Sequence, residues 1–137
     1  MSSIWESKNI SKSDYKKLHS FFWLSTLDLK SSKLSVQSVI LNWINKNKNY
    51  DAKSWDVDVL SKRIIAWISY SKISYENSNK EYKILFNSLI KKQVNHLINE
   101  IERSKSIDKK MISCSAIILA GLSYQEKQKY LDFGLGL

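Results

Sequence analysis

The stretch that decides the fold is SWDVDVLSKRIIAWI, residues 54–68. From Val57 onward, large apolar side chains recur every three or four positions, a spacing that places them on one face of a helix. That face consists of Val57, Leu60, Ile64, Trp67 and Ile68. Ile65 broadens it, which indicates a helix over residues 56–71 that is buried on more than one side. Asp56 is its expected N-cap.

The same helical period extends through most of the chain. The sequence has 137 residues with no proline and only three glycines, so the residues that usually interrupt helices are almost absent. The expected helices cover residues 11–28, 34–46, 56–71, 79–103 and 108–122, with a sixth that begins at a Ser123 cap. No stretch has the alternation of a strand. We therefore expect an all-α fold of antiparallel helical hairpins, in one domain over residues 1–137.

The expected core comes from these apolar faces. In the helix over residues 79–103 the stripe is Tyr82, Leu85, Phe86, Leu89, Ile90, Val94, Leu97, Ile98 and Ile101. Residues 108–122 are so apolar that we expect that helix to be central or covered on both sides. We expect Trp43, Trp67 and Leu97 to be core residues.

Two helix starts carry capping signals. Ser11 or Ser13 is expected to cap the first helix, whose buried face would include Tyr15, Leu18 and Phe22. Ser78 is expected to cap the helix over residues 79–103, with Glu81 as its capping-box partner.

Charge and composition narrow the classes of partner. The net charge is +9, but 20 of the 22 basic residues are lysines, and Arg63 and Arg103 are the only arginines. Nucleic-acid readers favour arginine, and these lysines are scattered, so we disfavour a nucleic-acid partner. The single Cys114 permits no intramolecular disulfide and is interpreted as a small core residue. No apolar run is long enough to span a membrane and no signal peptide is visible, so we predict a cytoplasmic protein.

Several short motifs follow one another in a consistent order. They are Trp43-Ile44, Asn47, Trp55, Ser61-Lys62-Arg63-Ile64, Ala66-Trp67-Ile68 and the AIILAGLSY of residues 116–124. In order and spacing, residues 20–124 resemble the N-terminal helical region of the heparinase II/III family. The resemblance implies the first part of an incomplete α/α toroid. The rest of the toroid and a β-sandwich domain would then lie beyond Leu137.

The resemblance also implies a chemistry. The family cleaves uronate-containing polysaccharides by β-elimination, with general acid–base catalysis and neutralisation of the uronate carboxylate. Its members carry an Asn-His pair shortly before the alanine-rich helix, where this chain has Asp108-Lys109-Lys110. Asn95 and His96 are the catalytic candidates here, although they lie a dozen residues too early and in mid-helix. The simpler interpretation of His96 is a histidine on the flank of a helix near the core. We expect the isolated chain not to cleave polysaccharide.

Arg63, Trp55 and Trp67 are the candidate substrate-binding residues. A tryptophan facing the toroid cleft could form a sugar platform, with Arg63 gripping a carboxylate. The structural alternative is that the tryptophans wedge between hairpins. Arg63 would then stack on Trp67 or bind carbonyls at the end of a neighbouring helix.

The partner that these features imply is an acidic polysaccharide, and neither a cofactor nor a metal is implied. A non-catalytic helical binding module for an acidic glycan, a protein or a nucleic acid is the alternative.

Overall fold

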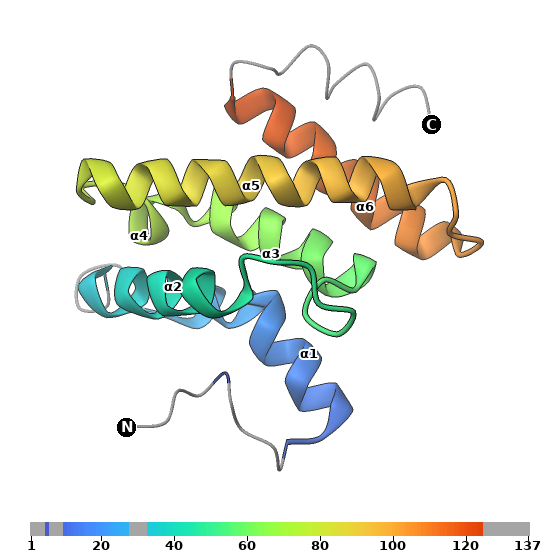
Figure 1. Cartoon of the computed structure of the whole chain (residues 1–137), viewed down its shortest axis with the longest axis horizontal. Coiled ribbons are helices and arrows are strands. Elements are labelled where there is room, and N and C mark those ends of the chain that lie inside the picture. The colour runs from blue at the N-terminus through green and yellow to red at the C-terminus, as the bar shows by residue number, and fades with distance from the viewer. Residues whose placement is uncertain (1–4, 6–9, 28–32, 125–137) are drawn as a thin grey trace.

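The computed structural model describes residue 5, residues 10–27 and residues 33–124 (Figure 1). Its elements are α1 (Lys12–Ser20), the 3-10 helix η2 (Phe22–Thr26), α2 (Lys33–Asn47), α3 (Val57–Ser69), α4 (Ser71–Ser74), α5 (Lys80–Ile101) and α6 (Ile107–Ser123). No strand occurs among these described residues, and the expected all-α class is confirmed.

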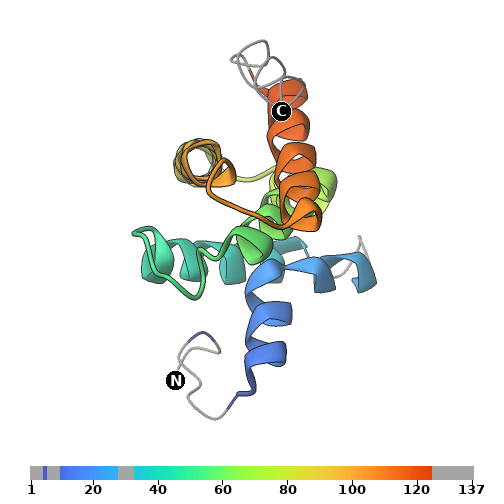
Figure 2. The ribbon, with the colours of Figure 1, turned by 90° about the vertical axis from the view of Figure 1, so that its right-hand side faces the viewer.

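The helix α3 lies at the centre of the arrangement. It packs against α1, α5 and α6, and also contacts η2 and α4. The long helices α2, α3, α5 and α6 alternate in direction along the chain (Figure 1). Seen from the side, α1 and α6 lie on opposite sides of α3 (Figure 2). Each short connection thus brings the chain back antiparallel to the helix before it.

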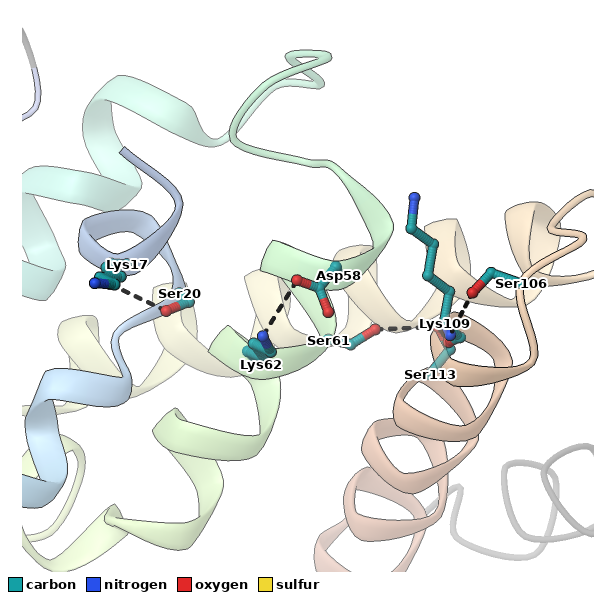
Figure 3. Close-up of polar contacts among 8 residues, drawn as sticks. All are labelled: Lys17, Ser20, Asp58, Ser61, Lys62, Ser106, Lys109 and Ser113. Atoms are coloured by element: carbon teal, nitrogen blue, oxygen red, sulfur yellow. Dashed lines mark hydrogen bonds and ion pairs between the residues drawn. The ribbon is translucent and has the colours of Figure 1, made fainter. Parts of the chain in front are cut away.

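The expectation that residues 108–122 form a helix that is central or covered on both sides is wrong. The buried residues of α6 lie on one face and are Ser113, Ala116, Ile117, Ala120 and Gly121. Because most of them are small, α6 packs closely on α3, and Ser113 lies 3.2 Å from Ser61 of α3 between the two hydroxyl oxygens (Figure 3). Met111 and Leu122 point elsewhere and are 64% and 63% exposed.

The first helix is shorter than the period predicts. Ser11 caps it, as expected, by accepting a hydrogen bond from the backbone N–H of Asp14 (3.1 Å). It ends at Ser20 because Phe21 adopts a left-handed conformation (φ 59°) and buries its ring completely. The chain continues as a 3-10 turn, which leaves Phe22 43% exposed instead of on the predicted buried face. A non-glycine residue in this region is unfavourable, so packing of the Phe21 ring must offset the cost.

Two predicted caps differ from the structure. Asn79, not Ser78, caps α5, since Asn79 Oδ1 accepts the N–H of Tyr82 (2.8 Å). The Ser78 hydroxyl turns back and donates to the carbonyl of Tyr75. Asp56 lies at the N-cap of α3, but its side chain makes no capping hydrogen bond.

The apolar stripe of α5 is confirmed except at its borders. Tyr82, Phe86, Leu89, Ile90, Val94, Leu97 and Ile101 are buried. Leu85 is 42% exposed and Ile98 is only partly buried, because both lie at the borders of that stripe.

An aromatic cluster fills the centre of the core. The rings of Trp43 and Trp67 meet at right angles, 5.5 Å apart between centroids. Phe21 lies edge-on to both rings, and Phe86 stacks on Trp67 at 5.2 Å. Trp43, Trp67 and Leu97 are all fully buried, which confirms their predicted place in the core.

The end of α6 also differs from the sequence expectation. Ser123 lies in the last turn of α6, where its hydroxyl donates to the carbonyl of Leu119. The predicted sixth helix falls on residues 125–137, outside the described residues. No described helix has the length and apolarity that crossing a membrane would require.

Candidate functional site

Arg63 is buried in the core, where it joins three segments that are distant in sequence. Its Nε donates to Gln93 Oε1 of α5 (2.7 Å), and its Nη1 donates to the carbonyls of His19 (2.9 Å) and Ser54 (2.8 Å). The guanidinium also stacks over the Trp43 ring, 4.1 Å from its centroid. The structural interpretation of Arg63 is therefore half right. It does bind a carbonyl at the end of a neighbouring helix, α1, but its stacking partner is Trp43 and not Trp67.

His19 lies beside this arginine and is also buried. The Trp43 indole N–H donates to His19 Nδ1 (3.0 Å), so Nδ1 carries no proton and the neutral ring is protonated at Nε2. Burial, with the nearby Arg63 charge as the next cause, lowers the pKa of His19 from 6.5 to about 4. His19 is consequently neutral at pH 7.

Hydrogen bonds that involve Arg63 hold the connection between α2 and α3, residues 48–56, in place. The Asp51 carboxylate accepts from the backbone N–H (3.1 Å) and the hydroxyl (3.0 Å) of Ser54, whose carbonyl binds Arg63. Burial works to raise the pKa of Asp51, but these hydrogen bonds and one from Lys53 outweigh it and lower the pKa. The Trp55 indole N–H bonds the carbonyl of Asn47 at the end of α2 (2.9 Å). This connection is therefore held in one conformation by Arg63 of α3 and by the end of α2.

The connection presents an aromatic surface against α5. Tyr50 is 63% exposed, and its ring lies 5.2 Å from the His96 ring between centroids. Trp55 is buried, and its ring lies edge-on to His96 at 5.5 Å and 6.4 Å from the Tyr50 ring. The Lys92 ammonium is 5.8 Å from the centroid of the Trp55 ring. We call Tyr50, Trp55, Lys92 and His96 the Tyr50 face.

The Tyr50 face is positively charged at neutral pH. The ammonium of Lys92 donates to the carbonyl of Lys48 (2.6 Å) and to Asn49 Oδ1 (3.5 Å), neither of which carries a charge. An ammonium has three donors, so one remains for an anionic ligand. His96 adds a polar ring without a charge, because burial lowers its pKa despite the opposing effect of Glu100.

The structure separates the residues predicted from the sequence. Trp55 and His96 meet in the Tyr50 face, and Asn95 is exposed beside them. Arg63 and Trp67 are fully buried and contact other core side chains, which supports their structural interpretation. Asp108, Lys109 and Lys110 are exposed in the first turn of α6, where Ser106 caps the backbone N–H of Lys109 (Figure 3).

Sequence reasoning missed Tyr50, Lys92 and Gln93. Tyr50 lies in a polar connection, where a single exposed aromatic residue is common and gives no distinguishing signal. Gln93 interrupts the apolar stripe of α5 between Ile90 and Val94, and a buried glutamine in such a stripe predicts a polar partner. Lys92 has no distinguishing feature in the sequence.

A groove of about 760 Å³ lies between α1, η2 and α3. Phe22 and Trp23 line it together with Lys17 and Lys62. The Lys62 ammonium is paired with Asp58 at 3.2 Å (Figure 3). The described part of the chain contains no group of His, Cys, Asp and Glu side chains suited to hold a metal ion.

Comparisons with protein-family models, with curated proteins and with solved structures each found no match.

Proposed function

We propose that this chain forms the first helices of a heparinase II/III-like α/α toroid and binds an acidic polysaccharide through the Tyr50 face without cleaving it alone. The observation that carries the binding proposal is the exposed Tyr50 ring, which lies 5.2 Å from the His96 ring and 6.4 Å from the Trp55 ring, with the Lys92 ammonium 5.8 Å from the same Trp55 ring. Antiparallel helices in succession are compatible with the toroid. Of the residues from which the family resemblance was drawn, Trp43 stacks against the Arg63 guanidinium.

The chemistry of the Tyr50 face suits a uronate or sulfated sugar. A sugar ring would stack on the exposed face of Tyr50, and the remaining Lys92 donor would bind its carboxylate or sulfate. Neutral His96 would hydrogen-bond a hydroxyl. Because Arg63 and Asp51 hold the connection in place, the ligand would meet a surface that is already ordered, which reduces the entropic cost of binding.

The absence of turnover follows from the chemistry that β-elimination needs. The reaction requires a base, a carboxylate neutraliser and a proton donor held in one geometry. Tyr50 and His96 lie together, but the Asn-His pair that the resemblance implies is replaced by Asp108-Lys109-Lys110. We expect no unsaturated uronate product when the purified chain is incubated with heparan sulfate or alginate.

Binding is tested by calorimetry with heparan sulfate and alginate oligosaccharides of defined length. Lys92→Gln and Tyr50→Ala should each weaken binding by about threefold to tenfold, which corresponds to about 0.7–1.4 kcal/mol. Lys80→Gln is the matched control: it removes the same charge at the far end of α5 and should change the affinity less than about twofold. Equal losses in Lys92→Gln and Lys80→Gln would mean that only net charge matters.

Duplex DNA of matched charge separates this proposal from nucleic-acid binding. A glycan site should depend on oligosaccharide length and sugar type. Tighter binding to DNA, with a steep salt dependence and no selectivity among glycans, would favour the nucleic-acid alternative and contradict the proposal.

A further inference from the structure

We propose that α6 pairs antiparallel with α6 of a second copy of this chain through an exposed apolar stripe. The side chains of this stripe share one face of the helix, and we call them the α6 stripe: Ile107, Met111, Cys114, Ser115, Ile118 and Leu122. None of these residues belongs to the Tyr50 face, so the inference does not rest on the proposed glycan binding.

The α6 stripe lies away from the face through which α6 packs on α3 and α5. Ile107, Met111 and Leu122 are 74%, 64% and 63% exposed, and Cys114 and Ile118 are half-buried. The helix itself lies at one side of the arrangement (Figure 2). Single exposed apolar residues are normal, but a row of them along a whole helix indicates a contact surface.

The pattern of the α6 stripe is the same when it is read from either end. Four positions separate Ile107 from Met111 and Ile118 from Leu122, and the midpoint falls between the two small residues at the centre. A second copy turned about a two-fold axis at this midpoint places its Leu122 opposite Ile107 and its Ile118 opposite Met111. Large apolar side chains then meet each other, and the small central residues allow the helices to approach closely. A symmetric dimer requires a surface that is complementary to itself in this way.

The charges at the two ends of α6 also favour the antiparallel orientation. Lys109 and Lys110 are exposed in the first turn, and the last turn has no basic residue to offset the negative end of the helix dipole. In an antiparallel pair, the lysines of one copy lie beside the last turn of the other. The 17-residue helix is about 26 Å long, so the lysines of the two copies are then farther apart than the Debye length of about 8 Å. A parallel pair would instead bring all four lysines together.

Sedimentation of the purified chain at increasing concentration tests the pairing. The average mass should rise from 16.0 kDa towards twice that value. The association should be weak and reversible, because one helix of each copy supplies the contact, whereas a standard interface takes about 20–30 residues from each side. A monomer at every concentration, up to the millimolar range, would mean that another segment or partner covers the α6 stripe, and would overturn the proposal.

A matched pair of variants shows whether the α6 stripe forms the contact. Met111→Asp should weaken dimerisation by about tenfold or more, because it would bury an unpaired carboxylate. Leu34→Asp makes the same kind of change at a position of α2 that is 82% exposed, and it should leave the association unchanged. Both substitutions lower the net positive charge equally, so a loss confined to Met111→Asp is not an effect of total charge. Equal effects of the two variants would contradict the proposal.

Disulfide formation tests the antiparallel register. Met111→Cys and Ile118→Cys are made separately, each in a Cys114→Ser background. A mixture of the two proteins should form an intermolecular disulfide about tenfold faster than either protein alone, because the antiparallel pair places positions 111 and 118 opposite each other. Equal or faster formation in either protein alone would indicate a different orientation and rule out the proposed pair.

Discussion

Arg63 carries a full positive charge in the interior, and no acidic side chain hydrogen-bonds to it in the described part of the chain. Burial lowers the pKa of Arg63 from 12.5 to about 9, so the guanidinium still holds its proton at pH 7. Two carbonyls, an amide oxygen and the face of Trp43 replace part of the water that it loses, while the buried Nη2 has no hydrogen-bond partner among the described residues. Such a site is specific for arginine, because the guanidinium donates hydrogen bonds from both Nε and Nη1 and stacks its flat face on Trp43.

Replacing Arg63 with lysine should therefore be strongly destabilising. The lysine ammonium cannot reach all three acceptors and also stack, so we expect Arg63→Lys to lower the free energy of unfolding by about 3 kcal/mol. Urea denaturation measures the change. Arg103→Lys is the matched control, since Arg103 is exposed and pairs with Glu100 on the surface, and should change stability by less than about 0.5 kcal/mol. Equal effects at the two positions would show that the guanidinium of Arg63 is not needed for stability.

His19 should make stability depend on pH. Its pKa is about 4 in the folded chain and 6.5 when exposed, so between these values the unfolded chain binds more protons. Its contribution is fully present above pH 6.5 and is lost as the pH falls towards about 4. Protonation would also set two N–H groups against each other at Trp43.

Urea denaturation at several pH values measures this dependence. The free energy of unfolding should fall by at most about 1.4 kcal/mol per pH unit in this range, and His19→Gln should flatten the curve. His96→Gln is the comparison: burial lowers the pKa of this half-buried histidine in the same direction, so its removal should flatten the curve less. A wild-type curve that is flat between pH 6.5 and 4.5 would contradict the assignment.

At the scale of the elements, helix periodicity predicted most of the fold. The positions of α2, α3, α5 and α6 follow from apolar spacing, which reflects burial directly. The end of α1 could not be predicted in this way. Periodicity continues past Ser20, but the ring of Phe21 fits between Trp43 and Trp67 only when the backbone turns. A tertiary contact thus overrides local propensity there.

The candidate site was less predictable than the helices. The sequence identified Trp55 and His96 separately, but their meeting depends on how the connection of residues 48–56 folds against α5. That conformation depends on hydrogen bonds from Asp51 to Ser54 and from Ser54 to Arg63, and no local pattern encodes them. The exposure of Tyr50 follows from the same conformation.

The observed cap of α5 gives a prediction for a single helix end. Asn79→Ala removes the acceptor for the Tyr82 N–H and should lower the free energy of unfolding by about 1 kcal/mol. Ser78→Ala is the neighbouring control and should cost less than half as much, because the Ser78 hydroxyl caps no N–H group. Thermal or urea denaturation distinguishes the two. A larger loss in Ser78→Ala would restore the capping role that the sequence suggested.

At the scale of the whole molecule, the helices surround α3 and not the most apolar segment. The difference comes from side-chain size: α3 supplies large residues and the arginine, while the buried face of α6 consists of alanine, glycine and serine with one isoleucine. The high apolar content of α6 predicted that it would be central. The size of the side chains on the buried face of each helix instead decides which helix the others surround. The apolar residues left on α6 lie outside that contact.

The bond between Arg63 and the carbonyl of His19 has a consequence for how the molecule opens. Terminal helices usually fray, and their amides exchange with solvent through small local openings. If α1 detached, the guanidinium would lose an acceptor while remaining in the core, and the Trp43 N–H would lose His19. Detachment of α1 is thus coupled to disruption of α3 and α5. The amides of α1 should exchange almost as slowly as those of the central helix, as part of one cooperative unit.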